Sequence, residues 1–209
     1  MLHMKMTICG QRLLPLALVL LLALGTVACM TLPKPLYFTL DMSTAPGEGA
    51  GYTALDQRQV SIDTIRVTDK LVRRDILIRL GETEVEYYHD TKWVARPSDL
   101  VAEKLAIEFM PPPRTAADAP PVLLLYGDLL AFEQVDAVDG SVYAHIRLRA
   151  GLRPEGRGRH AAVHERLYEF LEPVTADGPM PKAVVEVLSH GLEVIAAEIA
   201  QDANRIPLD

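Results

Sequence analysis

Strict alternation between Val142 and Ala150 constrains the fold of this chain more than any other segment. Every even-numbered residue there is apolar, while the odd positions hold Tyr143, His145, Arg147 and Arg149. This period of two indicates a β-strand with one buried face and one solvated face. Asp139-Gly140 just before it is a strong hairpin signal, so the apolar run 122–132 is predicted to be its antiparallel partner.

Apolar patterns predict further strands at residues 36–40, 60–67, 76–80, 85–89 and 161–171. Within the second of these, Val60 and Ile62 have the opposite parity from Ile65 and Val67, so we expect a β-bulge near Asp63 and Thr64. Two stretches are predicted to be connections. Residues 41–57 are polar and glycine-rich, but lack the helical periodicity that a nucleotide-binding glycine loop requires, and residues 111–121 are rich in proline.

Two amphipathic helices complete the pattern. Pro97 and Ser98 begin the first helix, whose apolar stripe is predicted to contain Val101, Leu105 and Phe109, with Ala102 and Ala106. The second runs from about Pro181 to Asn204, with apolar residues at helical spacing. Helices with one apolar stripe must cover a sheet face, so the element order predicts an α+β fold: a two-layer sandwich, mostly antiparallel, with both helices on one face.

Residues 1–28 have the layout of a secretory signal. They contain no acidic residue, carry Lys5 and Arg12 near the start, and then run apolar from Leu13 to Leu24. As a helix this apolar run would span about 18 Å, against about 30 Å for the hydrocarbon layer of a bilayer. It is therefore expected to be cleaved rather than to remain as a membrane span.

The segment Leu24–Cys29 resembles a bacterial lipobox, in which the cysteine after the cleavage site is acylated, although Thr26 stands where Leu is usual. The competing interpretation is a secreted protein with a free N-terminal thiol. An unpaired cysteine is a liability in an oxidising compartment, and Cys29 has no disulfide partner once the leader is removed. We therefore expect a signal peptide at 1–28, lipid attachment at Cys29, a tether over 29–35 and one domain over 36–209.

Charge and hydropathy exclude several classes of protein. The leader holds two of the 21 basic residues and none of the 28 acidic ones, so the net charge changes from −7 to −9 on cleavage. Such a chain is not expected to bind nucleic acid through bulk charge. Contact with a membrane must then come from the anchor or from a local patch, because no second apolar stretch is long enough to span a bilayer.

Signals for catalysis or metal binding are weak. His160 and His164 would share a metal only on a helix, whereas the strand predicted here separates them by about 13 Å. His89-Asp90 resembles an orienting pair for a general base, but no nucleophile in a strand-turn-helix setting accompanies it. We therefore expect a protein that is not an enzyme, with no metal and no cofactor besides the lipid on Cys29.

Two features are candidates for an interface or for contact with lipid headgroups. One is a concentration of cations on the alternating strand and the following turn, formed by Arg147, Arg149, Arg153, Arg157 and Arg159. Guanidinium groups pair well with phosphate and carboxylate, although a solvated face balanced by acids is the simpler interpretation. The other is Trp93, the lone tryptophan, which belongs either to the core or to an interface.

Several segments together suggest a family. They are Cys29, the Tyr37–Leu40 strand, the Arg73–Arg79 strand, the passage from Lys92-Trp93 to Pro97, and the closing helix with Glu193 and Ile195. On these features the mature chain resembles the ABC-type transport auxiliary lipoproteins, the PqiC/YmbA-like proteins.

The resemblance implies an accessory subunit of an MCE-type ABC transporter, which moves phospholipid or other hydrophobic molecules across the envelope of Gram-negative bacteria. Its implied partners are an MCE-domain protein and, through it, an ABC permease and an ATPase. The lipid on Cys29 would hold the domain on the periplasmic side of the outer membrane, an address that Met30 favours. The transported substrate and the number of copies of the chain in an assembly, including a homo-oligomer, stay open.

Two alternatives belong to other functional classes. A periplasmic lipid-binding module would hold an acyl chain between helices and sheet. An envelope hydrolase would depend on His89 or His164.

Overall fold

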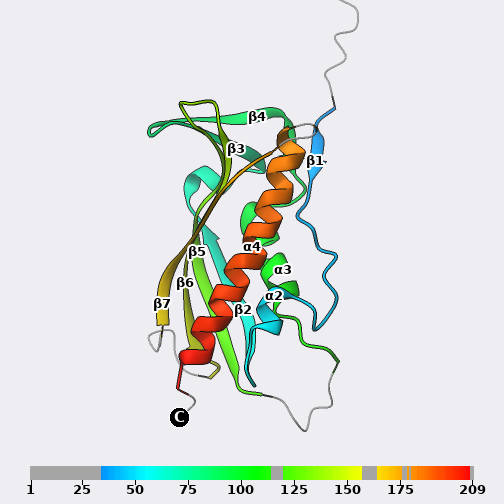
Figure 1. The fold of residues 1–209 in the computed structure, drawn as a ribbon, viewed down its shortest axis with the longest axis vertical. Coiled ribbons are helices and arrows are strands. Elements are labelled where there is room, and N and C mark those ends of the chain that lie inside the picture. Colours follow the sequence, from blue (N-terminus) through cyan, green and yellow to red (C-terminus); the bar gives the residue numbers. More distant parts are fainter. Residues whose placement is uncertain (1–33, 114–119, 157–163, 176–177, 179, 208–209) are drawn as a thin grey trace, which may run out of the picture. The chain divides into compact units, whose positions relative to one another are not determined.

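The central element of the fold is the fifteen-residue strand β5 (Val122–Asp136). It belongs to a computed structural model that describes residues 34–113, 120–156, 164–175, 178 and 180–207. Within these residues the chain forms seven strands, three α-helices and one 3-10 helix, η1 (Asp69–Leu71). All seven strands belong to one open sheet, shown in Figure 1.

β5 is paired along both of its edges. On one side it continues into an antiparallel meander with β6 (Val142–Pro154) and β7 (His164–Pro173). On the other side it pairs in parallel, first with β2 (Gln59–Val67) and then with β3 (Asp75–Leu80). β3 continues antiparallel to β4 (Glu84–Trp93), and β1 (Leu36–Phe38) pairs in parallel with the end of β4.

The predicted α+β fold class is confirmed. The two longest ladders, β5–β6 and β6–β7, are antiparallel as expected, but β1, β2 and β3 each form a parallel pairing, so the sheet is mixed. Parallel pairing needs partners that are distant in the chain, and no local pattern of hydrophobicity specifies them.

Two local predictions about the strands are confirmed. The register of β2 against β5 shifts between Ile62 and Thr64, where the parity of its apolar residues changes. β5 and β6 are joined by a tight turn in which Gly140 has a φ of 85°, a conformation that favours glycine.

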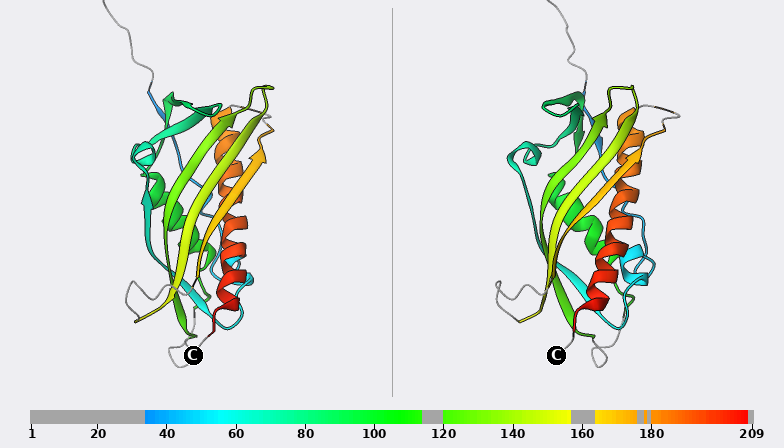
Figure 2. Two further views of the ribbon diagram at one scale, coloured as in Figure 1. Left: turned by 90° about the vertical axis from the view of Figure 1, so that its left-hand side faces the viewer. Right: turned by 60° about the vertical axis from the view of Figure 1, so that its left-hand side comes forward.

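Helices α3 (Pro97–Glu108) and α4 (Met180–Arg205) cover the same face of the sheet, as Figures 1 and 2 show. Between the helices and the sheet lie buried apolar side chains, with the Trp93 and Phe132 ring centroids 5.2 Å apart. Burial of such side chains stabilises a fold by about 1.5–3 kcal/mol each. The predicted two-layer arrangement with both helices on one face is therefore present.

The buried side of α3 differs from the prediction. Val101, Leu105 and Phe109 are buried as expected, but Ala106 is exposed, whereas Lys104 and Glu108 are 0 % and 1 % exposed. The helix is rotated so that these two charged residues point inward, because they pair with each other and with groups from other elements.

Residues 36–58 form a continuous segment, the N-terminal strap, that follows α4 (blue to cyan in Figure 1). The Asp41 amide donates to Ser189 Oγ (3.1 Å) in the first half of α4, and the Asp56 amide donates to Asn204 Oδ1 (2.9 Å) near its end. Part of this strap, predicted to be loop, contains the short helix α2 (Ala50–Thr53). Hydrogen bonds to two separate parts of α4 therefore fix the strap to the helix layer.

Gly49 is expected to be essential for docking of the N-terminal strap. A Cβ there would lie 2.6 Å from the Cα of Glu108 and closer still to its carbonyl oxygen, so the strap would have to move away from α3. Gly49→Ala should destabilise the protein by about 1–3 kcal/mol, measured by urea unfolding with Trp93 fluorescence. Gly178→Ala is the control, because a Cβ there meets no described atom within 4 Å; equal stability of the two variants would contradict this packing.

Candidate functional site

The chain enters the fold through β1, at one edge of the sheet. Cys29, the predicted lipid attachment residue, lies outside the described residues, as does most of the predicted tether 29–35. From Leu36 the backbone is held by pairing with Thr91, Lys92 and Trp93 of β4. The Val94 amide extends this contact by donating to the Phe38 carbonyl (2.9 Å).

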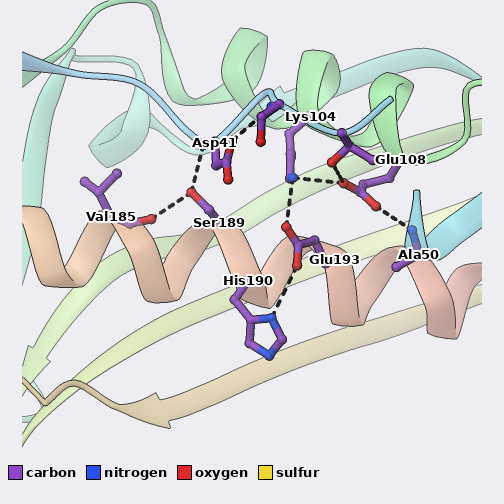
Figure 3. A network of polar contacts seen from close by, with 10 residues as sticks. Asp41, Ala50, Lys104, Glu108, Val185, Ser189, His190 and Glu193 are labelled. Carbon is purple, nitrogen blue, oxygen red and sulfur yellow. Dashed lines mark hydrogen bonds and ion pairs between the residues drawn. The ribbon is translucent and has the colours of Figure 1, made fainter. Parts of the chain in front are cut away.

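A buried ionic network joins the N-terminal strap to both long helices (Figure 3). Lys104 Nζ lies 2.9 Å from Glu108 Oε1 and 3.0 Å from Glu193 Oε1. The second oxygen of Glu108 accepts a hydrogen bond from the Ala50 amide (2.7 Å), and the Thr44 hydroxyl donates to Oε1 (3.1 Å). One carboxylate thus connects α3 to the strap, while Lys104 connects α3 to α4.

Burial by itself lowers the pKa of Lys104, but hydrogen bonds to Glu108 and Glu193 outweigh it and raise the pKa above its ordinary value. The lysine is therefore charged, and so able to compensate the buried carboxylate. Neither Lys104 nor Glu108 was predicted as a site residue from the sequence. The signal was present in the i, i+4 spacing of Lys104 and Glu108 among Leu100, Val101 and Leu105, which places both charges on the apolar side of α3.

A second ionic cluster lies on the sheet around Glu133, which is 0 % exposed. Its carboxylate accepts two hydrogen bonds from Arg79 (2.7 and 3.1 Å) and lies 3.2 Å from Lys70 Nζ and 3.4 Å from His145 Nδ1. Burial raises the pKa of Glu133, but hydrogen bonds from His145 and Arg79 and the nearby positive charges lower it to about 2. The cluster joins β3, β5 and β6.

A third cluster holds the end of α4 against β7. Asp202 of α4 is 2 % exposed and accepts hydrogen bonds from Arg166 (3.1 Å) and from the Tyr168 hydroxyl (3.0 Å), while His164 Nε2 lies 3.2 Å away. Burial raises the pKa of Asp202, but the hydrogen bonds from Arg166 and Tyr168 outweigh it and lower the pKa. Burial also raises the pKa of Tyr168, which therefore remains a donor.

The structure only partly assembles the predicted arginine patch. Arg147 lies 3.4 Å from Glu169, and Arg153 lies 2.9 Å from Asp63, so acids of the same chain balance both cations, as the simpler interpretation predicted. Arg149 is exposed on β6. Arg157 and Arg159 lie outside the described residues.

Trp93 requires a correction as an interface candidate. Its side chain is 0 % exposed and packs on Phe132, so it belongs to the core, which was the other interpretation of its position. The candidates for catalysis are not brought together either. His89 and Asp90 are exposed residues within β4, and His164 begins β7, where it faces Asp202. His160 lies outside the described residues.

Two surface grooves follow α4. One, of about 780 Å³, lies between α4 and β7 and is bordered by Leu171, Pro173, Val187 and Val194, with Glu169, Glu172, Glu186 and Glu198 around them. The other, of about 540 Å³, lies between residues 38–41 and the first half of α4. Both are lined by apolar and acidic side chains, a combination that suits protein contacts.

Within the described part of the chain, no helix has the length and hydropathy needed to cross a bilayer. The same residues include no group of three or more His, Cys, Asp or Glu side chains arranged to hold a metal ion.

Comparison with known families gives one clear result. A family model described as "ABC-type transport auxiliary lipoprotein component" matches residues 38–200, which is most of the chain. The match begins at the last residue of β1 and ends in α4, so it includes strands β2 to β7 and the N-terminal strap from Phe38 onward. No curated protein sequence matches the chain significantly.

Solved structures share the fold at low sequence identity. The structure of a protein from Xanthomonas campestris has a TM-score of 0.62 and 17 % identity, covering 79 % of this chain and 92 % of that one. An uncharacterized protein has a TM-score of 0.57 and 15 % identity, covering 81 % of this chain and 99 % of its own. At these identities the likeness supports the fold alone.

Lys104→Met should destabilise the protein by roughly 3–5 kcal/mol, because it leaves the buried Glu108 carboxylate without its counter-ion. Lys182→Met is a matched control, since Lys182 and Glu186 are also an i, i+4 pair but their side chains are 65 % and 64 % exposed. That variant should change the free energy of unfolding by less than about 1 kcal/mol. Urea denaturation measures both; equal effects would show that burial of the network is not what matters.

Glu133→Gln should remove part of the acid sensitivity of the fold. Because the folded-state pKa of Glu133 is about 2, below the ordinary 4.5, its carboxylate stabilises the fold above pH 4.5 and loses that contribution as the pH falls towards 2. The variant should be less stable near pH 7 by roughly 2–3 kcal/mol and should lose less stability between pH 4.5 and 2. Glu169→Gln, at a half-exposed carboxylate, is the control; parallel pH profiles for Glu133→Gln and the wild type would contradict the assignment.

Proposed function

Since the chain belongs to the ABC-type transport auxiliary lipoprotein family, we propose that it is a lipid-anchored subunit that positions a transport system within the bacterial envelope. Its anchor is the acylated Cys29, and its folded domain is the part that the transporter contacts. The transporter is of the MCE type and moves phospholipid or other hydrophobic molecules, and the anchor lies on the periplasmic side of the outer membrane. The resemblance of the mature chain and the Met30 that follows Cys29 support this finer assignment.

The observation that carries the proposal is the short connection between the lipobox-like cysteine and a firmly held N-terminal strap. Leu36 is the seventh residue after Cys29, so the first strand lies within about 25 Å of the lipid-modified residue even if the connection is fully extended. The strap is then hydrogen-bonded to Ser189, Glu108 and Asn204. An anchor at Cys29 therefore constrains the folded domain as a whole rather than a loose end.

Placement is a sufficient role for such a subunit. Each buried methylene of an acyl chain contributes about 0.8 kcal/mol, so a multiply acylated cysteine holds a protein stably at a bilayer. Confinement raises the effective concentration of the domain for a transporter end near the same membrane, so a modest intrinsic affinity is enough. The family is a family of transport components rather than of enzymes, which is consistent with a role in placement.

The alternative of a lipid-binding module has less support. An acyl chain held between helices and sheet would need space there, but this layer contains Leu125, Leu148 and Ile195, each at most 1 % exposed. The hydrolase alternative has no assembled geometry, because His89 is exposed on β4 and His164 is engaged with Asp202.

Cys29→Ser should leave a folded but mislocalised domain with lost transport. The matched control is Cys9→Ser, which changes the chain's other cysteine inside the predicted leader. Intact-mass analysis should find fatty acids on the wild type and on the Cys9→Ser protein, but not on Cys29→Ser. Membrane fractionation and an assay of lipid transport complete the test, with urea unfolding as the check of folding. A bare thiol on the processed wild type would reject the anchor, and normal transport by Cys29→Ser would reject placement as the function.

A further inference from the structure

Exposed apolar and basic side chains gather where the chain enters the fold. We define the entry patch as Tyr37, Val72, Arg73, Arg74, Lys92 and Val94. Its three apolar members are between 45 % and 53 % exposed, and all belong to the exposed large hydrophobic residues of the domain. These residues belong to or adjoin β1, η1 and β4. This part of the domain lies at the end opposite the C-terminus (Figures 1 and 2).

Strand register and side-chain contacts connect the members of the patch. Tyr37 is directly opposite Lys92 in the β1–β4 ladder, and Lys92 is directly opposite Asp75 of β3, so the three side chains share a face. Asp75 in turn bridges Lys92 (3.3 Å) and Arg73 (2.9 Å), and the exposed Val72 precedes Arg73 in the chain. Arg74 reaches the carbonyl of Val94 (3.3 Å), which places Val94 beside the second arginine.

The charge of the patch is opposite to that of the protein. The Arg73 and Lys92 side chains are 64 % and 37 % exposed, while the carboxylate between them is only 12 % exposed. Arg74 is exposed as well. The patch therefore has three cations, Arg73, Arg74 and Lys92, and the one acid that bridges two of them, Asp75, is largely covered. The chain as a whole carries a net charge of −7, so this surface is locally basic.

Three glutamates lie at the other end of the hairpin that β3 and β4 form. Glu82, Glu84 and Glu86 surround the turn at Gly81, whereas Lys92 and Arg73 lie at the base. The six residues of β3 separate the two ends by about 20 Å, which exceeds the Debye length of about 8 Å at physiological salt. The glutamates at the turn therefore repel an anionic surface only weakly when that surface lies against Lys92 and Arg73.

From this geometry we infer that the entry patch lies against the bilayer to which Cys29 is anchored, with its cations on anionic phospholipid headgroups and its apolar side chains in the interfacial layer. The inference rests on the proposed lipid anchor, because the short connection from Cys29 to Leu36 keeps the start of β1, beside which this surface lies, within about 25 Å of the lipid-modified residue. Basic residues beside an anchor supply the second membrane signal that fixes an orientation. The grooves along α4 are then left for the transporter.

A spin label at Val94→Cys in the full-length acylated protein tests this orientation. The acylated Cys29 does not react, so the introduced cysteine is the only labelling site. In vesicles of phosphatidylethanolamine and phosphatidylglycerol, the label should become accessible to oxygen and protected from a water-soluble nickel chelate. Leu167→Cys is the control, because Leu167 is similarly exposed, at 39 % against 45 %, but lies on β7; its label should stay in water.

Reversing the charge of two arginines distinguishes binding to anionic headgroups from mere proximity to the membrane. Arg73→Glu with Arg74→Glu should shift the equilibrium of the Val94→Cys label away from membrane contact by at least about 25-fold, since each basic residue near an anionic surface contributes about a fivefold change. Arg66→Glu with Arg149→Glu makes the same charge change at exposed arginines of β2 and β6 and should leave the label unchanged.

Intact mass of each labelled sample decides which proposal fails. A bare Cys29 overturns the anchor and, with it, this inference. If Cys29 is acylated but the Val94→Cys label is as exposed to water as the Leu167→Cys label, the inference is overturned and the anchor is not. The third outcome is a label that responds to the changes at Arg66 and Arg149 but not to those at Arg73 and Arg74. This result would assign the membrane contact to the open face of the sheet and would also overturn the inference.

Discussion

The buried carboxylate of Glu108 is the constraint on which the arrangement of helices and strap depends. It is almost fully excluded from water, so its charge is tolerated only while Lys104, Thr44 and the Ala50 amide surround it. Those groups come from the same helix and from a segment more than fifty residues earlier in the chain. Since Lys104 also binds Glu193, α3, α4 and the N-terminal strap must assemble together, which couples the point of chain entry to the helix layer.

The same principle operates on the sheet. Glu133 and Asp202 are buried acids whose hydrogen-bonding partners come from neighbouring elements. Each lies where elements that are distant in the sequence meet. Ion pairs of this kind contribute little net stability, but an unpaired buried charge is strongly unfavourable. Each therefore acts mainly against wrong arrangements: a strand or helix in another register would leave a carboxylate without its cation.

For an anchored transport subunit, this rigidity has a consequence. A lipid on the N-terminal side orients the domain only if the chain that follows is fixed to the rest of the fold. The strap is fixed at Ser189, in the first half of α4, and at Asn204, near its C-terminal end. Helix α4 thereby fixes where the strap begins relative to the grooves that follow the helix. One end of the domain can then face a membrane while its side remains open to a partner.

Much of the fold could be predicted because its signals are local. The alternation in β6, the change of parity that produces the β2 bulge and the apolar spacing of α4 each follow from residues close in sequence, and each is confirmed. The expected attachment residue could be read from the leader and Cys29, since a targeting signal acts as a linear motif, and the expected function came from the resemblance of these and several short segments of the domain to one family. The arginine patch was only partly correct, because whether a cation is free depends on acids such as Glu169 and Asp63 that fold next to it.

The sequence by itself thus determined the element types, the α+β class and the expected attachment residue, because hydrophobic periodicity and cleavage signals are properties of short segments. Only the tertiary structure decided the parallel pairings of β1, β2 and β3, the burial of Trp93, Lys104 and Glu108, and the gathering of Tyr37, Arg73 and Val94 on one surface. These depend on which distant segments become neighbours. That choice is made by the simultaneous burial of apolar faces and pairing of buried charges, which no local pattern contains.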